Sequence, residues 1–138
     1  QFEDTQYYKK VEVVYSNGRR MAGVLDATEM DAEGFKVSPA DAVSPSERAR
    51  VKFSDIRSVT FYRRMVDLLA QKPRPQAKHA SMKRVELMFR RGDTISGYMQ
   101  REYAEGRQRF LELLPLDQSS DIDYIIVEHS SIVEKKTI

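Results

Sequence analysis

Alternating apolar and polar residues at two places in the chain predict β-strands. Apolar residues recur at every second position in 11–15 and again in 85–89, the pattern of a strand with one buried face. Gly18 and Gly92 follow these segments in the dipeptides Asn-Gly and Arg-Gly, which favour tight turns because glycine tolerates positive φ. Each segment is therefore predicted to be the first strand of a hairpin.

Further strands are expected after each hairpin turn. Gly23 and Gly97 lie in mid-strand, where glycine weakens a strand unless the strand bends or another backbone approaches closely. A one-turn helix is expected at 54–56 and at 130–132, each followed by a short closing strand. The second, third and fourth strands are predicted at 19–26, 34–38 and 49–53 in the first half, and at 93–101, 109–114 and 123–128 in the second.

The two halves of the chain match each other in order, which indicates an internal repeat. Gly23 and Gly97 are 74 residues apart, and the first strands match at the same offset. The offset then becomes 76, as between Pro39 and Pro115, which end the third strands, and between Ile56 and Ile132. We infer two copies of one domain.

Five short, strongly bent strands in each copy suggest a small closed barrel. The predicted fold is therefore all-β, with two tandem five-stranded SH3-like or Sm-like barrels and a short linker helix. The expected domains are a first barrel at 1–62, a basic linker at 63–82 and a second barrel at 83–138.

Each copy is small enough to be only marginally stable alone, because a domain of about 60 residues buries only about 60% of its unfolded surface. The two barrels are therefore expected to touch. In the linker, 64–71 places Met65, Leu68 and Leu69 on one helical stripe, which predicts a short amphipathic helix seated on a barrel.

The positive charge of the chain is concentrated in the segment around the linker. The net charge is +2, yet residues 63–84 carry seven basic side chains against Asp67 alone, for +6. Two interpretations are open: a solvated linker, or a segment that captures an anionic partner such as a nucleic acid or nucleotide. The candidate residues are Arg63, Arg64, Lys72, Arg74, Lys78, Lys83 and Arg84.

The composition excludes several classes of protein. Without cysteine there is no disulfide, no thiol nucleophile and no zinc–thiolate site. No apolar run approaches the roughly 18 residues of a membrane span, and no signal peptide is visible. The chain begins at Gln1, so an excerpt of a longer polypeptide is expected, with the cytoplasm as the default compartment.

The order of strands, turn glycine, mid-strand glycine and proline-ended strand resembles the Sm-like and SH3-like small barrels of uncharacterised bacterial regulatory proteins. This resemblance implies an interaction module within a larger regulatory protein. This chain differs from the RNA-binding Sm proteins in their first motif, because Asp31 stands where those proteins have asparagine. In their second motif the Arg-Gly pair is replaced by Arg57-Ser58, and the loops carry acidic residues that repel phosphate.

A weaker resemblance is to PilZ barrels, which bind cyclic dinucleotides. The resemblance lies in the size of the chain and in the arginines that precede a barrel. Arg63 and Arg64 are adjacent, whereas PilZ proteins space two arginines four residues apart to grip phosphates and guanine edges.

No enzyme signature emerges, and no cofactor or metal site is expected. His129, Ser130 and a carboxylate such as Asp121 or Asp123 are the residue types of a hydrolytic triad. Placed on one strand, however, His129 and Ser130 would point to opposite faces. Since His129 occupies the position of Phe53 in the repeat, it is expected to be a half-buried packing residue.

The expected function is a non-catalytic, cytoplasmic protein-interaction or scaffolding module. Tyr8 and Tyr62 are the candidate groove aromatics, because SH3-type grooves hold proline-rich segments against surface rings. The alternative is a nucleic-acid or anionic-ligand binder that uses the basic linker. Neither the partner nor the oligomeric state follows from the sequence.

Overall fold

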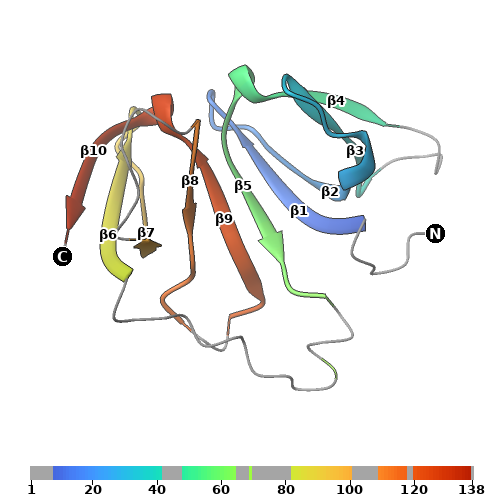
Figure 1. The fold of residues 1–138 in the computed structure, drawn as a ribbon. Helices are drawn as coiled ribbons and strands as arrows, with labels where there is room; N and C mark the ends of the chain where they lie inside the picture. The colour runs from blue at the N-terminus through green and yellow to red at the C-terminus, as the bar shows by residue number, and fades with distance from the viewer. Residues whose placement is uncertain are drawn as a thin grey trace.

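The computed structural model describes residues 8–41, 48–64, 69, 82–100, 109–117 and 120–137, and its fold is all-β (Figure 1). The described strands are β1 (Tyr8–Tyr15), β2 (Arg20–Asp26), β3 (Gly34–Pro39), β4 (Ala49–Lys52), β5 (Ile56–Tyr62), β6 (Met82–Phe89), β7 (Thr94–Gln100), β8 (Phe110–Leu113), β9 (Ile122–Glu128) and β10 (Ile132–Thr137). Short 3-10 helices occupy η1 (Ala27–Glu29), η2 (Phe53–Asp55) and η4 (His129–Ser131). In these same ranges there is no helix of the length and apolarity needed to cross a membrane.

All strand pairs are antiparallel, and they form two sheets. The larger sheet has the order β4-β3-β2-β1-β5-β9-β8 and is strongly curled, and the smaller has the order β10-β6-β7 (Figure 1). An isolated antiparallel bridge pairs Tyr98 on β7 with Leu114, the residue that directly follows β8. The strands thus follow the predicted sequence of elements in both halves.

The predicted hairpin turns and helical turns are present, with small shifts. Gly18 and Gly92 have φ of 90° and 88°, so both turns use the left-handed conformation that glycine adopts without strain. The helical turns begin at Phe53 and His129, one residue earlier than predicted. These two residues are 76 positions apart, the offset found between the halves.

Strand pairing in the second half repeats that of the first at the same offsets. Phe35 pairs with Val51 in β3·β4, and 76 residues later Leu111 pairs with Val127 in β8·β9. The irregularities repeat too: the register of β5 on β1 skips Arg57, and that of β10 on β6 skips Val133. Since 57 + 76 = 133, the two halves share even their β-bulges.

The mid-strand glycines mark close approaches between backbones, one of the two explanations that the sequence left open. A Cβ built on Gly23 would lie 2.4 Å from the Ser38 carbonyl oxygen. A Cβ on Gly97 would lie 2.7 Å from the Leu114 carbonyl oxygen, and residues 38 and 114 are again 76 apart. These glycines let the third strand of each half lie close against the second.

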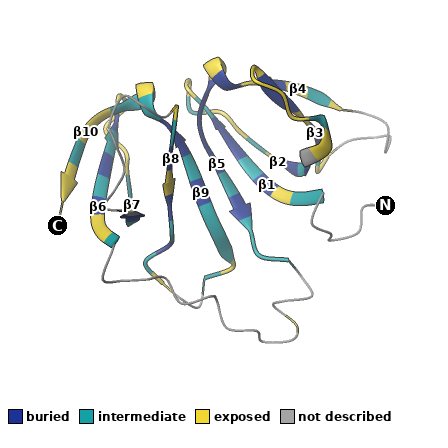
Figure 2. Ribbon diagram, viewed as in Figure 1, coloured by how far each residue is buried: buried dark blue, intermediate teal, exposed yellow. Residues whose placement is uncertain are grey.

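Each half has its own cluster of buried apolar side chains. Buried positions are dark blue along the strands of both halves in Figure 2. The first cluster is centred on Val11, Leu25 and Phe35, and the second on Leu87 and Leu113. The full buried sets are Val11, Val13, Leu25, Phe35, Val37, Val51, Phe53, Ile56, Val59 and Phe61 in the first, and Val85, Leu87, Phe89, Met99, Leu111, Leu113, Ile125 and Val127 in the second.

The two halves join where β5 pairs with β9, two strands that lie side by side in Figure 1. Because strand residues alternate between faces, β9 contributes to both clusters. Ile125 and Val127 belong to the second cluster, whereas Tyr124 and Ile126 pack against the first. Tyr124 stacks on Phe61 with ring centroids 4.6 Å apart. The expectation that the halves touch is therefore confirmed.

The stacked Tyr124 predicts a loss of stability at alkaline pH. Burial raises its pKa from the ordinary value of 10.0 to about 12, with the carboxylates of Glu112 and Asp123 adding to the shift. The unfolded chain therefore loses this proton first, so the stability contribution is intact below pH 10 and lost as pH rises toward 12. Urea unfolding at a series of pH values between 10 and 12 gives the free energy of unfolding at each pH. This free energy is expected to fall less steeply with pH in Tyr124→Phe than in the wild type. If the free energy of unfolding falls equally steeply in both proteins, burial at the junction does not keep the Tyr124 hydroxyl protonated.

The predicted linker helix falls almost entirely outside the described residues, and so do Met65 and Leu68. Leu69, the one described position between 65 and 81, has 77% of its surface exposed. At this position, therefore, the expected packing of the apolar stripe against a barrel is not found.

Candidate functional site

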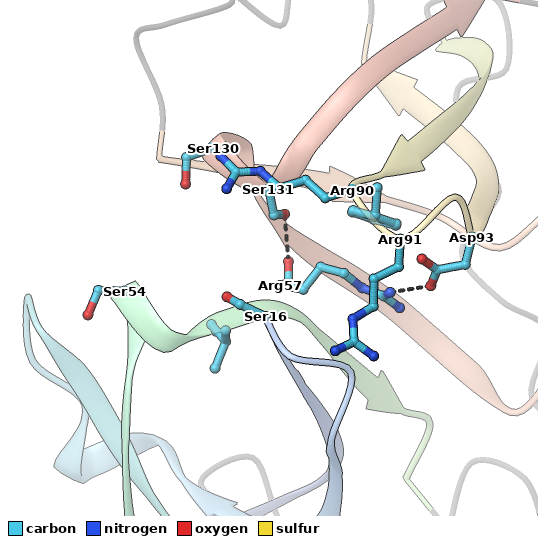
Figure 3. Close-up of a pocket in the computed structure, with 10 residues that line it drawn as sticks. Ser16, Ser54, Arg57, Arg90, Arg91, Asp93, Ser130 and Ser131 are labelled. Carbon is cyan, nitrogen blue, oxygen red and sulfur yellow. Dashed lines mark hydrogen bonds and ion pairs between the residues drawn. The ribbon is translucent and has the colours of Figure 1, made fainter.

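A cavity of about 230 Å³ lies at the junction of the two halves (Figure 3). Its walls come from the β1–β2 turn, from η2 and the start of β5, from the β6–β7 turn and from η4. The lining residues are Ser16, Ser54, Ile56, Arg57, Phe89, Arg90, Arg91, Asp93, Ser130 and Ser131. Both halves thus build this cavity.

Arg57 is the buried charge of the cavity wall, with 7% of its surface exposed. It is the bulged residue of β5, and its guanidinium forms an ion pair with Asp93 from the β6–β7 turn (Figure 3). The same group lies 4.3 Å from the centroid of the Phe89 ring, a cation–π contact. Its Nε is buried without a hydrogen-bond acceptor. Arg57 therefore links the halves but leaves one donor unsatisfied.

Arg90 and Arg91 extend from the β6–β7 turn in different directions, Arg90 toward Ser130 and Ser131 and Arg91 toward the β1–β2 turn (Figure 3). Neither forms a hydrogen bond or an ion pair with any residue in the described ranges. The Arg91 guanidinium lies over the β1–β2 turn, because a Cβ on Gly18 would be 2.9 Å from its Nη1. The cavity rim therefore carries two arginines whose charge no described carboxylate balances.

The serines of the cavity differ in what their hydroxyl groups already bind. Ser16 Oγ donates to the Asp55 carbonyl at 3.2 Å, and Ser130 Oγ donates to the Glu128 carboxylate. Ser131 Oγ lies 2.7 Å from the Glu128 carbonyl and also within 3.5 Å of the Arg57 carbonyl (Figure 3). Ser54 has no hydrogen-bond partner within the described part of the chain.

The basic residues that the sequence singled out are not gathered into one site by the described structure. Arg63 and Arg64 are half-buried after the end of β5. Lys83 and Arg84 are exposed on β6, where adjacent residues point to opposite faces. Lys72, Arg74 and Lys78 lie outside the described residues.

The two candidate groove tyrosines lie on neighbouring strands and share a face of the sheet. Glu12 on β1 pairs with Thr60 on β5, and Tyr8 and Tyr62 have the same parity as these residues. Both rings are half-buried. Burial raises the pKa of Tyr62, and the carboxylates of Glu12 and Asp121 raise it further.

The triad residues have a different geometry from the one predicted. His129 and Ser130 do not alternate on a strand, because both belong to the helical turn η4. Ser130 is bonded to Glu128 rather than to an imidazole. His129 is half-buried at the position equivalent to Phe53, as expected. In the described part of the chain no three His, Asp or Glu side chains gather as metal ligands would.

The acidic loop between β2 and β3 is held by contacts within the chain. Asp31 accepts hydrogen bonds from Arg50 at 3.0 Å and from the backbone N–H groups of Glu33 and Gly34. The pKa of Asp31 is lowered, chiefly by the bond from Arg50. At the position where Sm proteins carry asparagine, this carboxylate therefore fixes the loop to β4.

The outer edges of β4 and β10 have no strand partner among the described residues. In β4, the side chains of Arg50 and Lys52 are exposed. In β10, Val133 is 56% exposed, and Glu134 and Lys136 are also exposed. The joined edges differ in composition, because the facing pairs of the β5·β9 junction include Val59 with Ile126 and Phe61 with Tyr124.

Sequence reasoning missed the cavity residues Arg57, Arg90, Arg91 and Asp93 as a group. The one available signal was the repeat itself: Arg57 stands where the second half has Val133, so this charge belongs to one copy only. Comparison of the chain with protein-family models, with curated proteins and with solved structures finds no match. The resemblance to Sm-like, SH3-like and PilZ barrels therefore rests on the sequence pattern alone.

Proposed function

We propose that the chain is a non-catalytic protein-interaction module of two tandem small barrels of the SH3-like or Sm-like type. The repeat of strand order, register and bulges at offsets of 74 and 76 supports a duplicated barrel. The junction itself carries the functional proposal: β5, the last strand of the first half, accepts the antiparallel strand β9 along its edge. Main-chain pairing of this kind is a general mode of peptide recognition.

The binding element in this proposal is β10, the last strand of the second half. It is the counterpart of β5, since Ile132 and Ile56 differ by 76, and its outer edge has no partner among the described strands. Val133 on this strand is exposed, whereas Arg57 at the corresponding position of β5 is buried against the other half. An added strand would cover Val133 and complete the pairing that β5 already makes.

The charges of β10 favour an acidic extended segment over a second copy of this chain. In the register of the junction, Val59 pairs with Ile126, so Lys135 would face Arg50 of a second copy. Like charges directly opposite each other destabilise a sheet. Thr60 pairs with Ile125, so Lys136 would face Ala49, which offers no carboxylate. The proposed partner therefore presents an extended strand with a carboxylate opposite Lys136.

A synthetic peptide of residues 122–128 that carries Ile125→Glu is the probe for this site. In the junction register it places glutamate opposite Lys136. NMR titration is expected to show shifts confined to Ile132–Thr137 and its neighbour β6. Lys136→Glu in the protein is expected to weaken binding about tenfold, as an ion pair is replaced by a repulsion.

The matched control is the same peptide with Ile125→Lys, which is expected not to bind. The proposal fails if the two peptides bind alike, if the shifts lie outside β10 and β6, or if neither peptide binds. Sedimentation of the protein alone tests the competing occupant. Concentration-dependent association that Lys135→Glu strengthens, by placing a carboxylate opposite Arg50 of the second copy, would mean that β10 pairs with a second copy.

A further inference from the structure

We infer that the junction cavity binds a phosphate group. The cavity has three arginines and one carboxylate among its lining residues, so its formal charge is +3 − 1 = +2. Arginine is suited to phosphate because its planar guanidinium donates two parallel hydrogen bonds to a pair of oxygens. This inference goes beyond the proposed function, since β10 takes no part in the cavity.

The three arginines are positioned differently toward a bound anion. Arg57 is held rigidly by its burial, by Asp93 and by the Phe89 ring, yet its Nε lacks an acceptor. That nitrogen is itself buried, so Arg57 contributes its charge to the cavity rather than a hydrogen bond from Nε. Arg90 and Arg91 at the rim have no described anionic partner. An anion beside either guanidinium would neutralise a charge that no described carboxylate balances.

The size of the cavity indicates a small ligand. Its volume of about 230 Å³ is below the roughly 300–1,000 Å³ of sites that enclose a drug-sized molecule. A phosphate dianion matches the charge of +2, and the unpartnered Ser54 hydroxyl offers a further donor. Both inorganic phosphate and the phosphomonoester of a small molecule satisfy this chemistry.

Titration of the whole chain at constant ionic strength tests the inference. Inorganic phosphate and glycerol 3-phosphate are the two probes, with chloride as the ionic-strength reference. Saturable NMR shifts are expected at Arg90–Asp93, in η2 and in η4. Saturation by both probes would indicate a phosphomonoester ligand, and saturation by inorganic phosphate alone would indicate the free anion. Saturation by neither would overturn the inference.

Three variants distinguish phosphate binding in the cavity from unspecific attraction of an anion to exposed basic side chains. Arg90→Gln with Arg91→Gln is expected to weaken binding at least about tenfold, because two charge-assisted contacts are lost. Arg84→Gln, an exposed arginine on β6 outside the cavity, is expected to bind as the wild type does. Asp93→Asn is expected to tighten binding, because it removes the competing carboxylate. Equal weakening by Arg84→Gln and the double variant would contradict the inference.

Discussion

Gly23→Ala is expected to destabilise the protein by about 3 kcal/mol, the upper part of the range for overpacking a tight contact. The new methyl group would lie 2.4 Å from the Ser38 carbonyl oxygen and 2.6 Å from Val37 Cγ1. A backbone oxygen cannot rotate away as a flexible side chain can, so β2 and β3 must separate. Chemical denaturation of the variant, followed by circular dichroism, measures the change.

Gly92→Ala is the matched control for this prediction. A Cβ there meets no atom within 4 Å, so its cost comes only from the left-handed backbone, about 1–2 kcal/mol. Gly97→Ala is expected to fall between the two, because its Cβ would be 2.7 Å from the Leu114 carbonyl oxygen. If Gly92→Ala is the most damaging of the three, the close approach of the second and third strands is not what requires glycine.

Asp93→Asn is expected to destabilise the protein more than Arg57→Met does, although both remove the same ion pair. Asparagine leaves the buried Arg57 guanidinium without a counter-charge, which costs about 2 kcal/mol after allowance for the 45% exposure of the Asp93 side chain. Methionine removes that charge together with its unsatisfied Nε, and it still packs on Phe89. Its expected cost is about 1 kcal/mol or less.

Urea unfolding of the two variants and of the double variant gives the comparison directly. The double variant is expected to resemble Arg57→Met, because Asp93 has no buried charge to balance once Arg57 is gone. If Arg57→Met proves the more damaging single change, the guanidinium stabilises the junction through packing rather than through its charge.

Local features of the fold could be predicted from the sequence because they depend on neighbouring residues. Alternation and a turn glycine predict a hairpin at Asn17-Gly18, and glycine in mid-strand predicts either a bend or a close approach at Gly23, of which the structure shows the close approach. The match of His129 to Phe53 correctly predicted a half-buried residue, which lies in the helical turn η4. The all-β class followed from the same local patterns.

The junction and its cavity could not be predicted in this way. The pairing of β5 with β9 places Thr60 opposite Ile125, and the residues of one strand do not predict which strand it pairs with. Arg57 and Asp93 meet across 36 residues of sequence, in a bulge and a turn that only the folded sheet brings together. The clustering of basic residues indicated a candidate anion site near the linker, whereas the residues that line the arginine cavity come from separate segments of both halves.

A designed disulfide between β5 and β9 tests most directly whether the halves join in one sheet. The chain has no cysteine, so Thr60→Cys with Ile125→Cys introduces a single pair at directly opposed positions. Mild oxidation is expected to cross-link this pair within one molecule and to raise resistance to unfolding. Thr60→Cys with Ile126→Cys, whose side chains lie on opposite faces, is expected to stay reduced. Equal cross-linking of the two variants, or none in a folded Thr60–Ile125 variant, would contradict the junction.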